Sequence, residues 1–156
     1  MVEELFQPLA QFVEDGIPFN QHLGVKVDHL DRGEAVLRIP WAKHLIGDVF
    51  RGAIHGGVLS MLIDTTGGAA VFSNLMGWRD RASTVDLRVD YLRPVPGDAD
   101  IVCAGRVLRM GNKVAVTQME IFSAEYPPEG SEARAKPLVL GKAVYNVLRS
   151  EKGKKK

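Results

Sequence analysis

The chain has 156 residues, a length that suits one domain with a single hydrophobic core. Hydrophobic residues make up 46% and charged residues 25%, as in an ordinary soluble globular protein. The formal net charge of +1 gives no sign of a nucleic-acid or membrane partner. The single cysteine, Cys103, excludes an internal disulfide, and its apolar strand-like surroundings favour a buried side chain over a thiol nucleophile. The acidic start lacks the basic residues of a secretory signal, so we expect a cytoplasmic protein.

The first 53 residues predict helix, hairpin and loop in that order. Apolar residues at helical spacing predict an N-terminal helix at about residues 2–14, short or broken because Pro8 lies inside it. Residues 25–30 and 34–39 have the pattern of strands, and the short spacer between them predicts a hairpin. Residues 41–53 follow no period, and we expect them to form a pocket wall beside the next helix.

Residues 55–76 predict a long central helix that is apolar almost all round, and such a helix is expected to be buried on all sides. Asp64 is its one charged residue, and an ionised carboxylate is costly there unless it has partners. It is therefore either a functional group or a carboxylate hydrogen-bonded to neighbours such as Thr65 or Thr66. The mid-run charge and the following glycine pair exclude a membrane span.

The second half of the chain predicts strands without intervening helices. Residues 84–91 alternate polar and apolar side chains, residues 100–109 and 113–123 flank a tight turn, and residues 139–148 form a final strand. We expect an exposed loop at residues 125–137 and a disordered lysine-rich tail at 150–156. The order predicts an α+β fold in one domain, residues 1–149, with an antiparallel sheet of about five or six strands wrapped around one long buried helix.

The start of the central helix is a second candidate functional feature. Gly56 and Gly57 leave the backbone open, and the partnerless N–H groups of a first helical turn favour an oxyanion. The alternative is that these glycines only permit close packing against a strand. Gly56 and Asp64 are about 12 Å apart along a helix axis, so one carbonyl cannot lie within about 3 Å of both. Joint action therefore requires a dimer, with Asp64 of one protomer facing Gly56 of the other.

The run His55-Gly56-Gly57 with an acid nine residues after the histidine resembles the hot-dog-fold acyl-CoA thioesterases, in particular the PaaI-like phenylacetate-pathway group. The segment Tyr91-Leu92-Arg93-Pro94 followed by Gly97-Asp98 is similar as well, and the resemblance covers roughly residues 20–149. It implies a hot-dog fold and hydrolysis of an acyl-CoA or aryl-CoA thioester to the free acid and CoA. It also implies a homodimer or a dimer of dimers, and no cofactor, since CoA is part of the substrate.

The same resemblance implies roles for individual residues. Asp64 corresponds to the general base or nucleophile, Gly56 to the backbone N–H that polarises the thioester carbonyl, and Thr84 to a hydroxyl that helps to hold water. The residues expected at the substrate are His55, Gly57, Val49, Asp48 and Thr65. Val49 departs from the pattern, because relatives often carry an asparagine there. We interpret His55 as a donor that fixes the loop and not as the base.

Two other functions stay open at this point. A hot-dog hydratase or dehydratase would need a catalytic histidine, for which His55 is the candidate, and a non-catalytic acyl-CoA-binding module would keep the pocket without turnover. The scattered histidines predict no metal site, and no phosphate-binding or dinucleotide fingerprint is present. Basic residues that could reach the CoA phosphates, or simply be solvated, are Arg88, Arg93, Arg106, Arg109 and Lys113. Aromatic residues that could line a pocket or fill the core are Trp41, Phe50, Phe72 and Trp78.

Overall fold

The computed structural model describes residues 2–75, 77 and 79–150, and its main feature is a six-stranded antiparallel sheet. The strand order is β1-β2-β6-β7-β8-β5. The strands are β1 (Lys26–Asp31), β2 (Glu34–Ile39), β5 (Arg81–Tyr91), β6 (Ile101–Met110), β7 (Val114–Ser123) and β8 (Val139–Leu148). The predicted α+β class and the number of strands are confirmed.

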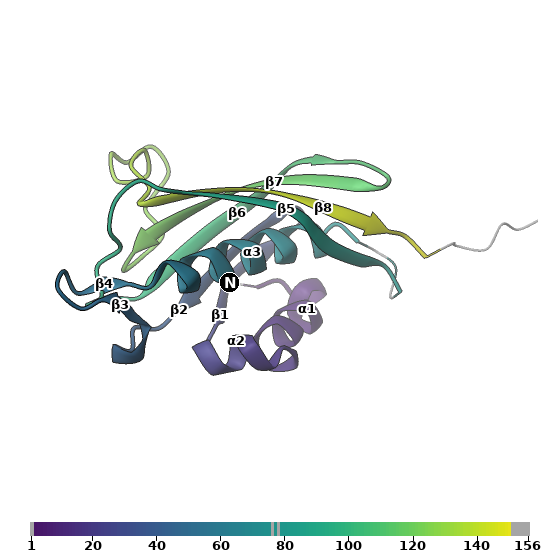
Figure 1. The fold of residues 1–156 in the computed structure, drawn as a ribbon. Helices are drawn as coiled ribbons and strands as arrows, with labels where there is room; N and C mark the ends of the chain where they lie inside the picture. Colours follow the sequence, from purple (N-terminus) through teal and green to yellow (C-terminus); the bar gives the residue numbers. More distant parts are fainter. Residues whose placement is uncertain (1, 76, 78, 151–156) are drawn as a thin grey trace, which may run out of the picture.

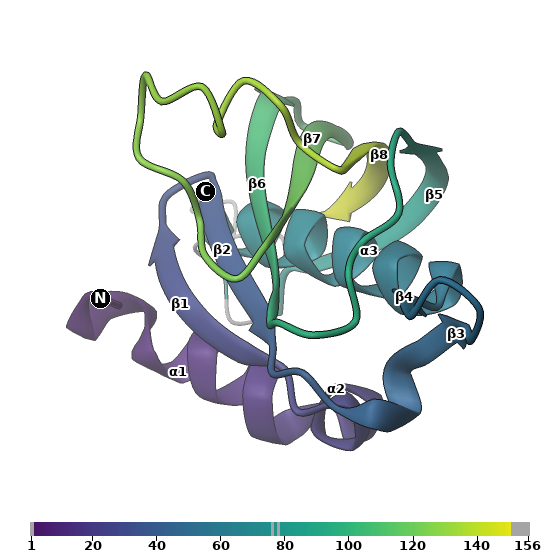
Figure 2. The ribbon, with the colours of Figure 1, turned by 90° about the vertical axis from the view of Figure 1, so that its left-hand side faces the viewer.

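The sheet curves around one long helix, α3 (Gly56–Phe72) (Figures 1 and 2). Two strand glycines lie where this helix passes closest. A Cβ added at Gly105 would lie 2.9 Å from Cγ2 of Thr66, and one added at Gly141 would run into Ile63. Because these positions of β6 and β8 carry no side chain, the helix can rest directly on the sheet.

The two sides of α3 differ in burial. The packed side, which faces the sheet, consists of Leu62, Ile63, Thr66, Gly67 and Ala70, all buried. The open side consists of Met61, Asp64, Thr65, Gly68 and Phe72, all of intermediate exposure. The expectation of burial on all sides is therefore wrong for the single chain, because the described residues cover the open side only in part.

The N-terminal segment forms a chain of short helical pieces beneath α3 (Figure 1). They are the 3₁₀ turn η1 (Glu4–Phe6), α1 (Gln7–Gln11), the π-helical turn η2 (Phe12–Gly16) and α2 (Pro18–Leu23). The helix predicted at residues 2–14 is thus divided, and Pro8 lies in the first turn of α1, where proline is tolerated. Val2 forms a bridge with Leu30, and Glu14 accepts from the Val27 N–H, so this segment covers the outer edge of β1.

Residues 41–53 contain more structure than the predicted loop. They form the 3₁₀ turn η3 (Lys43–Leu45) and a small hairpin of β3 (Ile46–Asp48) and β4 (Ala53–Ile54). Asp48 closes the turn of this hairpin, because its Oδ1 accepts from the backbone N–H groups of Phe50 and Arg51 at 3.0 and 3.1 Å. The strands are too short to produce a visible alternation in the sequence.

The end of the central helix and the start of the tail differ from the predicted positions. The central helix ends at Phe72 and not at residue 76, because the Ser73 hydroxyl donates to the Ala70 carbonyl and accepts from the Gly33 N–H. Residue 76 itself lies outside the described residues. Of the tail predicted to be disordered, Ser150 is held by Asp80, to which its N–H and hydroxyl donate at 2.8 and 2.9 Å. Residues 151–156 also lie outside the described part of the chain. No helix within that part is long and apolar enough to cross a membrane.

Candidate active site

Asp64 lies in the middle of α3 on its open side and receives hydrogen bonds from two strands. The Thr84 hydroxyl of β5 donates to its Oδ1 at 2.7 Å. The Tyr145 hydroxyl of β8 donates to its backbone oxygen at 2.8 Å and lies 3.4 Å from Oδ1. The expected partners Thr65 and Thr66 donate instead to Met61 and Leu62, one helical turn back, so the two partners named from the sequence are wrong. The carboxylate is therefore positioned by the sheet and not by its own helix.

Tyr145 is the functional candidate that the sequence did not reveal. It is only 2% exposed, and burial, together with the nearby Asp64 carboxylate, raises the pKa of its hydroxyl. The hydroxyl therefore stays protonated and remains a donor. The available signal was an inward-facing tyrosine in an otherwise aliphatic strand, since a buried tyrosine hydroxyl needs a partner.

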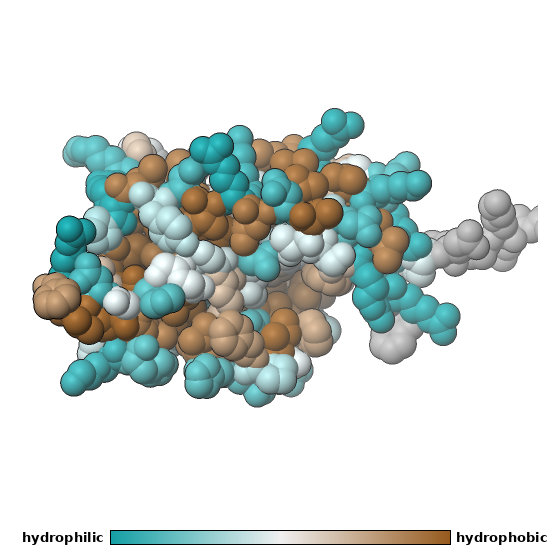
Figure 3. Space-filling model, in the orientation of Figure 1, coloured by the Kyte–Doolittle hydropathy of each residue, from teal (hydrophilic) through white to brown (hydrophobic). Residues whose placement is uncertain are grey.

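A hollow of about 170 Å³ opens beside Asp64, between α3 and the N-terminal segment. Figure 3 shows the face of the molecule onto which this part of the chain opens. Most of the residues that line the hollow are apolar or small: Leu9, Phe12, Val13, Ile17, Gly68, Ala69, Phe72 and Ala82. The polar residues in the lining are Asp64, Thr65, Thr84 and Tyr145. The predicted residues Asp64, Thr84 and Thr65 are thus brought together at one small cavity.

The other predicted group lies at the start of α3. His55 is the N-cap, and its Nδ1 accepts from the Gly57 N–H at 2.9 Å. The expectation that His55 acts as a donor is therefore corrected: the ring fixes the loop as an acceptor. No described residue accepts a hydrogen bond from the N–H of Gly56. The Gly56 carbonyl, in contrast, accepts from Tyr91 and Ser60 at 3.1 Å each.

The two groups remain apart in one chain. Helix α3 runs without a break from Gly56 through Asp64, so they are separated by about 12 Å of helix. Asp48 and Val49 belong to the β3–β4 hairpin, which lies at the N-terminal end of α3 (Figure 1). Val49 is 75% exposed and Phe50 is 98% exposed at the hairpin tip. Within a single chain, the two predicted groups therefore lie too far apart to act on one carbonyl.

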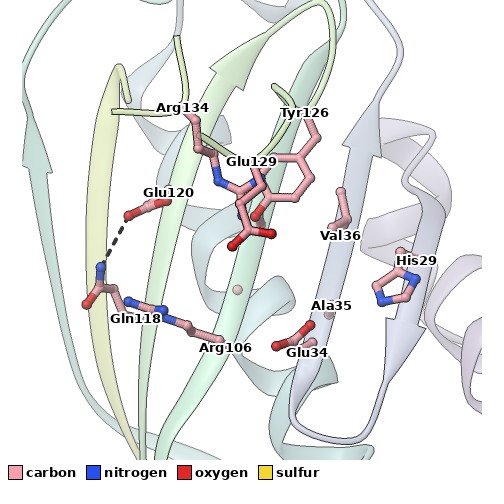
Figure 4. Close-up of a pocket in the computed structure, with 12 residues that line it drawn as sticks. His29, Glu34, Ala35, Val36, Arg106, Gln118, Glu120, Tyr126, Glu129 and Arg134 are labelled. Carbon is pink, nitrogen blue, oxygen red and sulfur yellow. Dashed lines mark hydrogen bonds between the residues drawn. The ribbon is translucent and has the colours of Figure 1, made fainter. Parts of the chain in front are cut away.

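A larger groove of about 600 Å³ lies on the opposite face of the sheet, under the 125–137 loop (Figure 4). Its charged lining residues are His29, Glu34, Arg106, Glu120, Glu129 and Arg134, and the guanidinium of Arg134 covers the Tyr126 ring at 3.7 Å. No predicted catalytic residue lines it. The sheet separates this groove from Asp64, so its size does not make it the reaction site.

The basic residues considered for the CoA phosphates have different surroundings. Arg88 is paired with Asp90 at 3.1 Å, and Arg93 donates to the backbone oxygens of Lys136 and Pro137. Among the described residues, no group of three His, Cys, Asp or Glu side chains is placed to hold a metal ion. Of the aromatic candidates, Phe72 lines the hollow and Phe50 is exposed, while residue 78 lies outside the described part.

Comparison with known proteins identifies a family, sequence relatives and solved structures that this chain resembles. The thioesterase superfamily matches residues 51–126. The medium/long-chain acyl-CoA thioesterase YigI of Escherichia coli is 30% identical over 121 residues, covering 70% of this chain and 77% of YigI. A Halobacterium salinarum protein with a provisional esterase name is 34% identical over 83% of each chain. The structure of a mutant of the phenylacetic acid degradation protein PaaI of Thermus thermophilus superposes with a TM-score of 0.69, at 27% identity over 85% of this chain and all of PaaI.

An antiparallel sheet around one central helix, with a carboxylate in mid-helix and an uncommitted N–H at the helix start, defines a hot-dog protein of the thioesterase type. The sequence matches agree with that class over most of the chain. The chain belongs to the thioesterase superfamily and is a hydrolase that acts on thioesters.

Proposed function

We propose that this protein hydrolyses an acyl-CoA or aryl-CoA thioester to the free acid and CoA, with each active site shared between two protomers. The observation that carries the proposal is the Asp64 carboxylate, held by Thr84 at the polar end of an apolar hollow. Such a site offers a fixed acceptor for a proton beside a space for an apolar acyl group. The name of YigI supports an acyl-CoA substrate.

Asp64 acts on water or directly on the thioester. As a general base, its carboxylate accepts a proton while the oxygen of water adds to the carbonyl carbon. The carbon–sulfur bond then breaks, and the CoA thiolate leaves and takes up the proton. As a nucleophile, the carboxylate would itself add to the carbonyl carbon, expel the thiolate and give an anhydride that water opens. The Thr84 hydroxyl, which donates to Asp64, keeps its oxygen free to accept from that water. Neither route needs a cofactor.

The Gly56 N–H of a second copy supplies the oxyanion donor. It is uncommitted within the chain, and it stands at the positive end of the α3 dipole. The substrate-contact positions expected near it are His55, Gly57, Val49 and Asp48, which lie at the same end of the helix. The developing negative charge on the thioester oxygen would be stabilised there, about 12 Å from the Asp64 of the same chain.

The edge of β5 is the surface on which the second copy docks. This strand is 11 residues long and ends the sheet, and no other described strand pairs with its outer edge. Val85 is 65% exposed and Tyr91 is 52% exposed, and Figure 3 shows hydrophobic side chains across this face. A long exposed edge strand with apolar side chains is a template for pairing with another chain. Because Thr84 lies on the same strand, pairing there would bring the partner to the Asp64 site.

The rival functions differ in what they need from the described residues. A hydratase would need a histidine as a base, but the Nδ1 of His55 already accepts from the Gly57 N–H and is not free to take a proton from substrate. A binding module would keep the hollow and lose turnover. Thiol release separates hydrolysis from both, and loss of enoyl-thioester absorbance on water addition would reveal the hydratase.

The deciding experiment measures thiol release from a panel of aliphatic and aryl-CoA thioesters. We expect Asp64→Ala to lower kcat by about a hundredfold or more, the usual range for a lost general base. Glu129→Ala is the matched control, because Glu129 is an exposed carboxylate at the groove on the opposite face of the sheet. Equal activity of the two variants, or no release from any thioester by folded wild type, would refute the proposal.

Subunit sharing has its own test. Gly56→Pro removes the N–H, while the preceding His55 at φ −63° and ψ 130° suits a residue before proline. Gly56→Ala keeps the N–H and is the control. Mixed and re-equilibrated with Asp64→Ala, inactive Gly56→Pro should recover about a quarter of wild-type turnover, because each mixed dimer contains one complete site. No recovery would place both groups of a site in one chain.

A further inference from the structure

We infer that the hollow beside Asp64 binds the acyl group of the substrate, and that it selects uncharged groups of about six carbons or a single aromatic ring. This inference rests on the proposed thioesterase activity and specifies its substrate class.

The volume sets the size. The hollow measures about 170 Å³, and an apolar protein cavity of about 150 Å³ is large enough to bind benzene. One phenyl ring or a six-carbon chain therefore fills it. A longer chain would have to leave the hollow toward solvent or the docked second copy, or displace the N-terminal segment. The preference should thus be shorter than the medium/long-chain range in the name of YigI.

The outer wall is made by the N-terminal segment. Leu9, Phe12, Val13 and Ile17 come from α1 and from the π-helical turn that follows it. The ring of Phe12 lies against Gly16, where an added Cβ would be 2.5 Å from its Cδ2, so glycine permits this position of the ring. Single π-turns occur frequently at functional sites, and this one places an aromatic side chain at the cavity.

The position of the charge sets the orientation and the polarity of the ligand. Asp64 is the one ionisable carboxylate in the lining, and it lies with the Thr84 and Tyr145 hydroxyls at the polar end. A thioester carbonyl at that end directs the acyl chain toward Leu9 and Phe12. A substrate with a second carboxylate would place a negative charge in an apolar cavity near Asp64, which is unfavourable.

Gly68 gives direct control of the space. It lines the hollow on the open side of α3, and an added Cβ would meet only Cε1 of Tyr145, at an ordinary 3.8 Å. Gly68→Leu should therefore fold and fill the cavity, since leucine is also a good helix former. Gly68→Ala adds one methyl group at the same position and serves as the matched control.

The experiment compares thiol release across straight-chain acyl-CoA thioesters from two to twelve carbons, together with phenylacetyl-CoA. We expect kcat/KM of wild type to be highest near six carbons or the ring substrate. Gly68→Leu should lower it at least tenfold for these and move the optimum toward the shortest chains, while Phe12→Ala should shift the optimum to longer chains. An active Gly68→Leu with an unchanged chain-length profile overturns the inference but leaves the proposed hydrolysis intact.

A binding measurement keeps the inference testable without turnover. Hexyl-CoA, a thioether that cannot be hydrolysed, is titrated into wild type, Gly68→Ala and Gly68→Leu by calorimetry. We expect wild type and Gly68→Ala to bind it and Gly68→Leu to bind it at least tenfold more weakly. If wild type binds hexyl-CoA in this way but releases no thiol, the proposed hydrolysis fails and the acyl pocket stands. Equal binding by all three proteins overturns the pocket assignment.

Discussion

The packed and open sides of α3 use the same kinds of residue for different purposes. On the packed side, Thr66 lies so close to the sheet that the facing strand position is glycine, and Gly67 lies directly against Tyr145 and Met119. On the open side, Thr65 and Gly68 border a hollow, and the helix has its one carboxylate there. Adjacent and chemically similar residues therefore have different roles, which are set by the direction in which each side chain points.

The packed side of α3 is therefore expected to determine stability, and the open side to determine activity. Changes on the packed side alter contacts with β6, β7 and β8, and a well-packed core resists added volume. Changes on the open side alter a cavity that already has room. Substitutions should therefore sort into those that reduce the free energy of unfolding and those that change activity, according to helical side and not according to residue type.

The adjacent glycines Gly67 and Gly68 give the strongest test of this contrast. An added Cβ at Gly67 would lie 2.5 Å from the Tyr145 hydroxyl oxygen and 2.9 Å from the Met119 sulfur. We expect Gly67→Ala to lower the free energy of unfolding by about 1–3 kcal/mol through overpacking. Gly68→Ala meets no obstacle and should raise it by up to about 1 kcal/mol, because alanine favours a helix interior. Urea unfolding of both variants measures the difference.

Equal free energies of unfolding of the two alanine variants would contradict this expectation. That result would mean that Tyr145 and Met119 yield at no cost, and the packed side would not be distinct. A second reading comes from activity: Gly67→Ala displaces the hydroxyl that holds Asp64, so its kcat should fall, whereas Gly68→Ala should retain turnover of short substrates.

Tyr145 connects the two sides, and its hydroxyl gives the next largest expected effect. Tyr145→Phe removes the hydrogen bond to the backbone of Asp64 but leaves the ring in the core. We expect kcat to fall about fivefold, because a lost hydrogen bond is worth about 1 kcal/mol and this one positions the carboxylate. KM should change little.

A purely structural role for Tyr145 predicts a different pattern. It would lower the free energy of unfolding and leave kcat of the remaining folded enzyme unchanged. Steady-state kinetics beside urea unfolding on the same preparations separates these cases. Tyr126→Phe is a suitable control, since it removes a tyrosine hydroxyl at the groove on the opposite face of the sheet, away from Asp64.

The sequence supported prediction of the fold because its main elements are long and periodic. The final strand matches the predicted residues 139–148, and the alternation at residues 84–91 lies within β5. The short pieces were harder to predict. The β3–β4 hairpin has strands of three and two residues, too few for a period, and the helix end at Phe72 depends on contacts between Ser73 and the distant β1–β2 turn.

The candidate site was predictable in its parts but not in its partners. A lone carboxylate in an apolar helix pointed to Asp64, and the helix rise showed that Gly56 could not reach the same carbonyl. Tyr145 could not be found in this way, because its contact with Asp64 spans 81 positions of the sequence and depends on the strand register. The acyl hollow depends likewise on how the N-terminal segment folds back onto α3.

Cys103 gives the smallest expected effect and tests the packed side by pH. It lies fully buried in β6, and burial raises the pKa of its thiol to about 12 from an ordinary value near 9. Below pH 9 the thiol is protonated in both states, so its contribution to stability is constant. Above that pH the unfolded thiol ionises while the folded one keeps its proton, so the free energy of unfolding should fall by about 1 kcal/mol per pH unit until the folded pKa is reached. Cys103→Ala removes this group, so its stability should decline less steeply between pH 9 and 10. Urea unfolding across that range measures both slopes, and parallel declines would show that the thiol beneath α3 is not shielded from solvent.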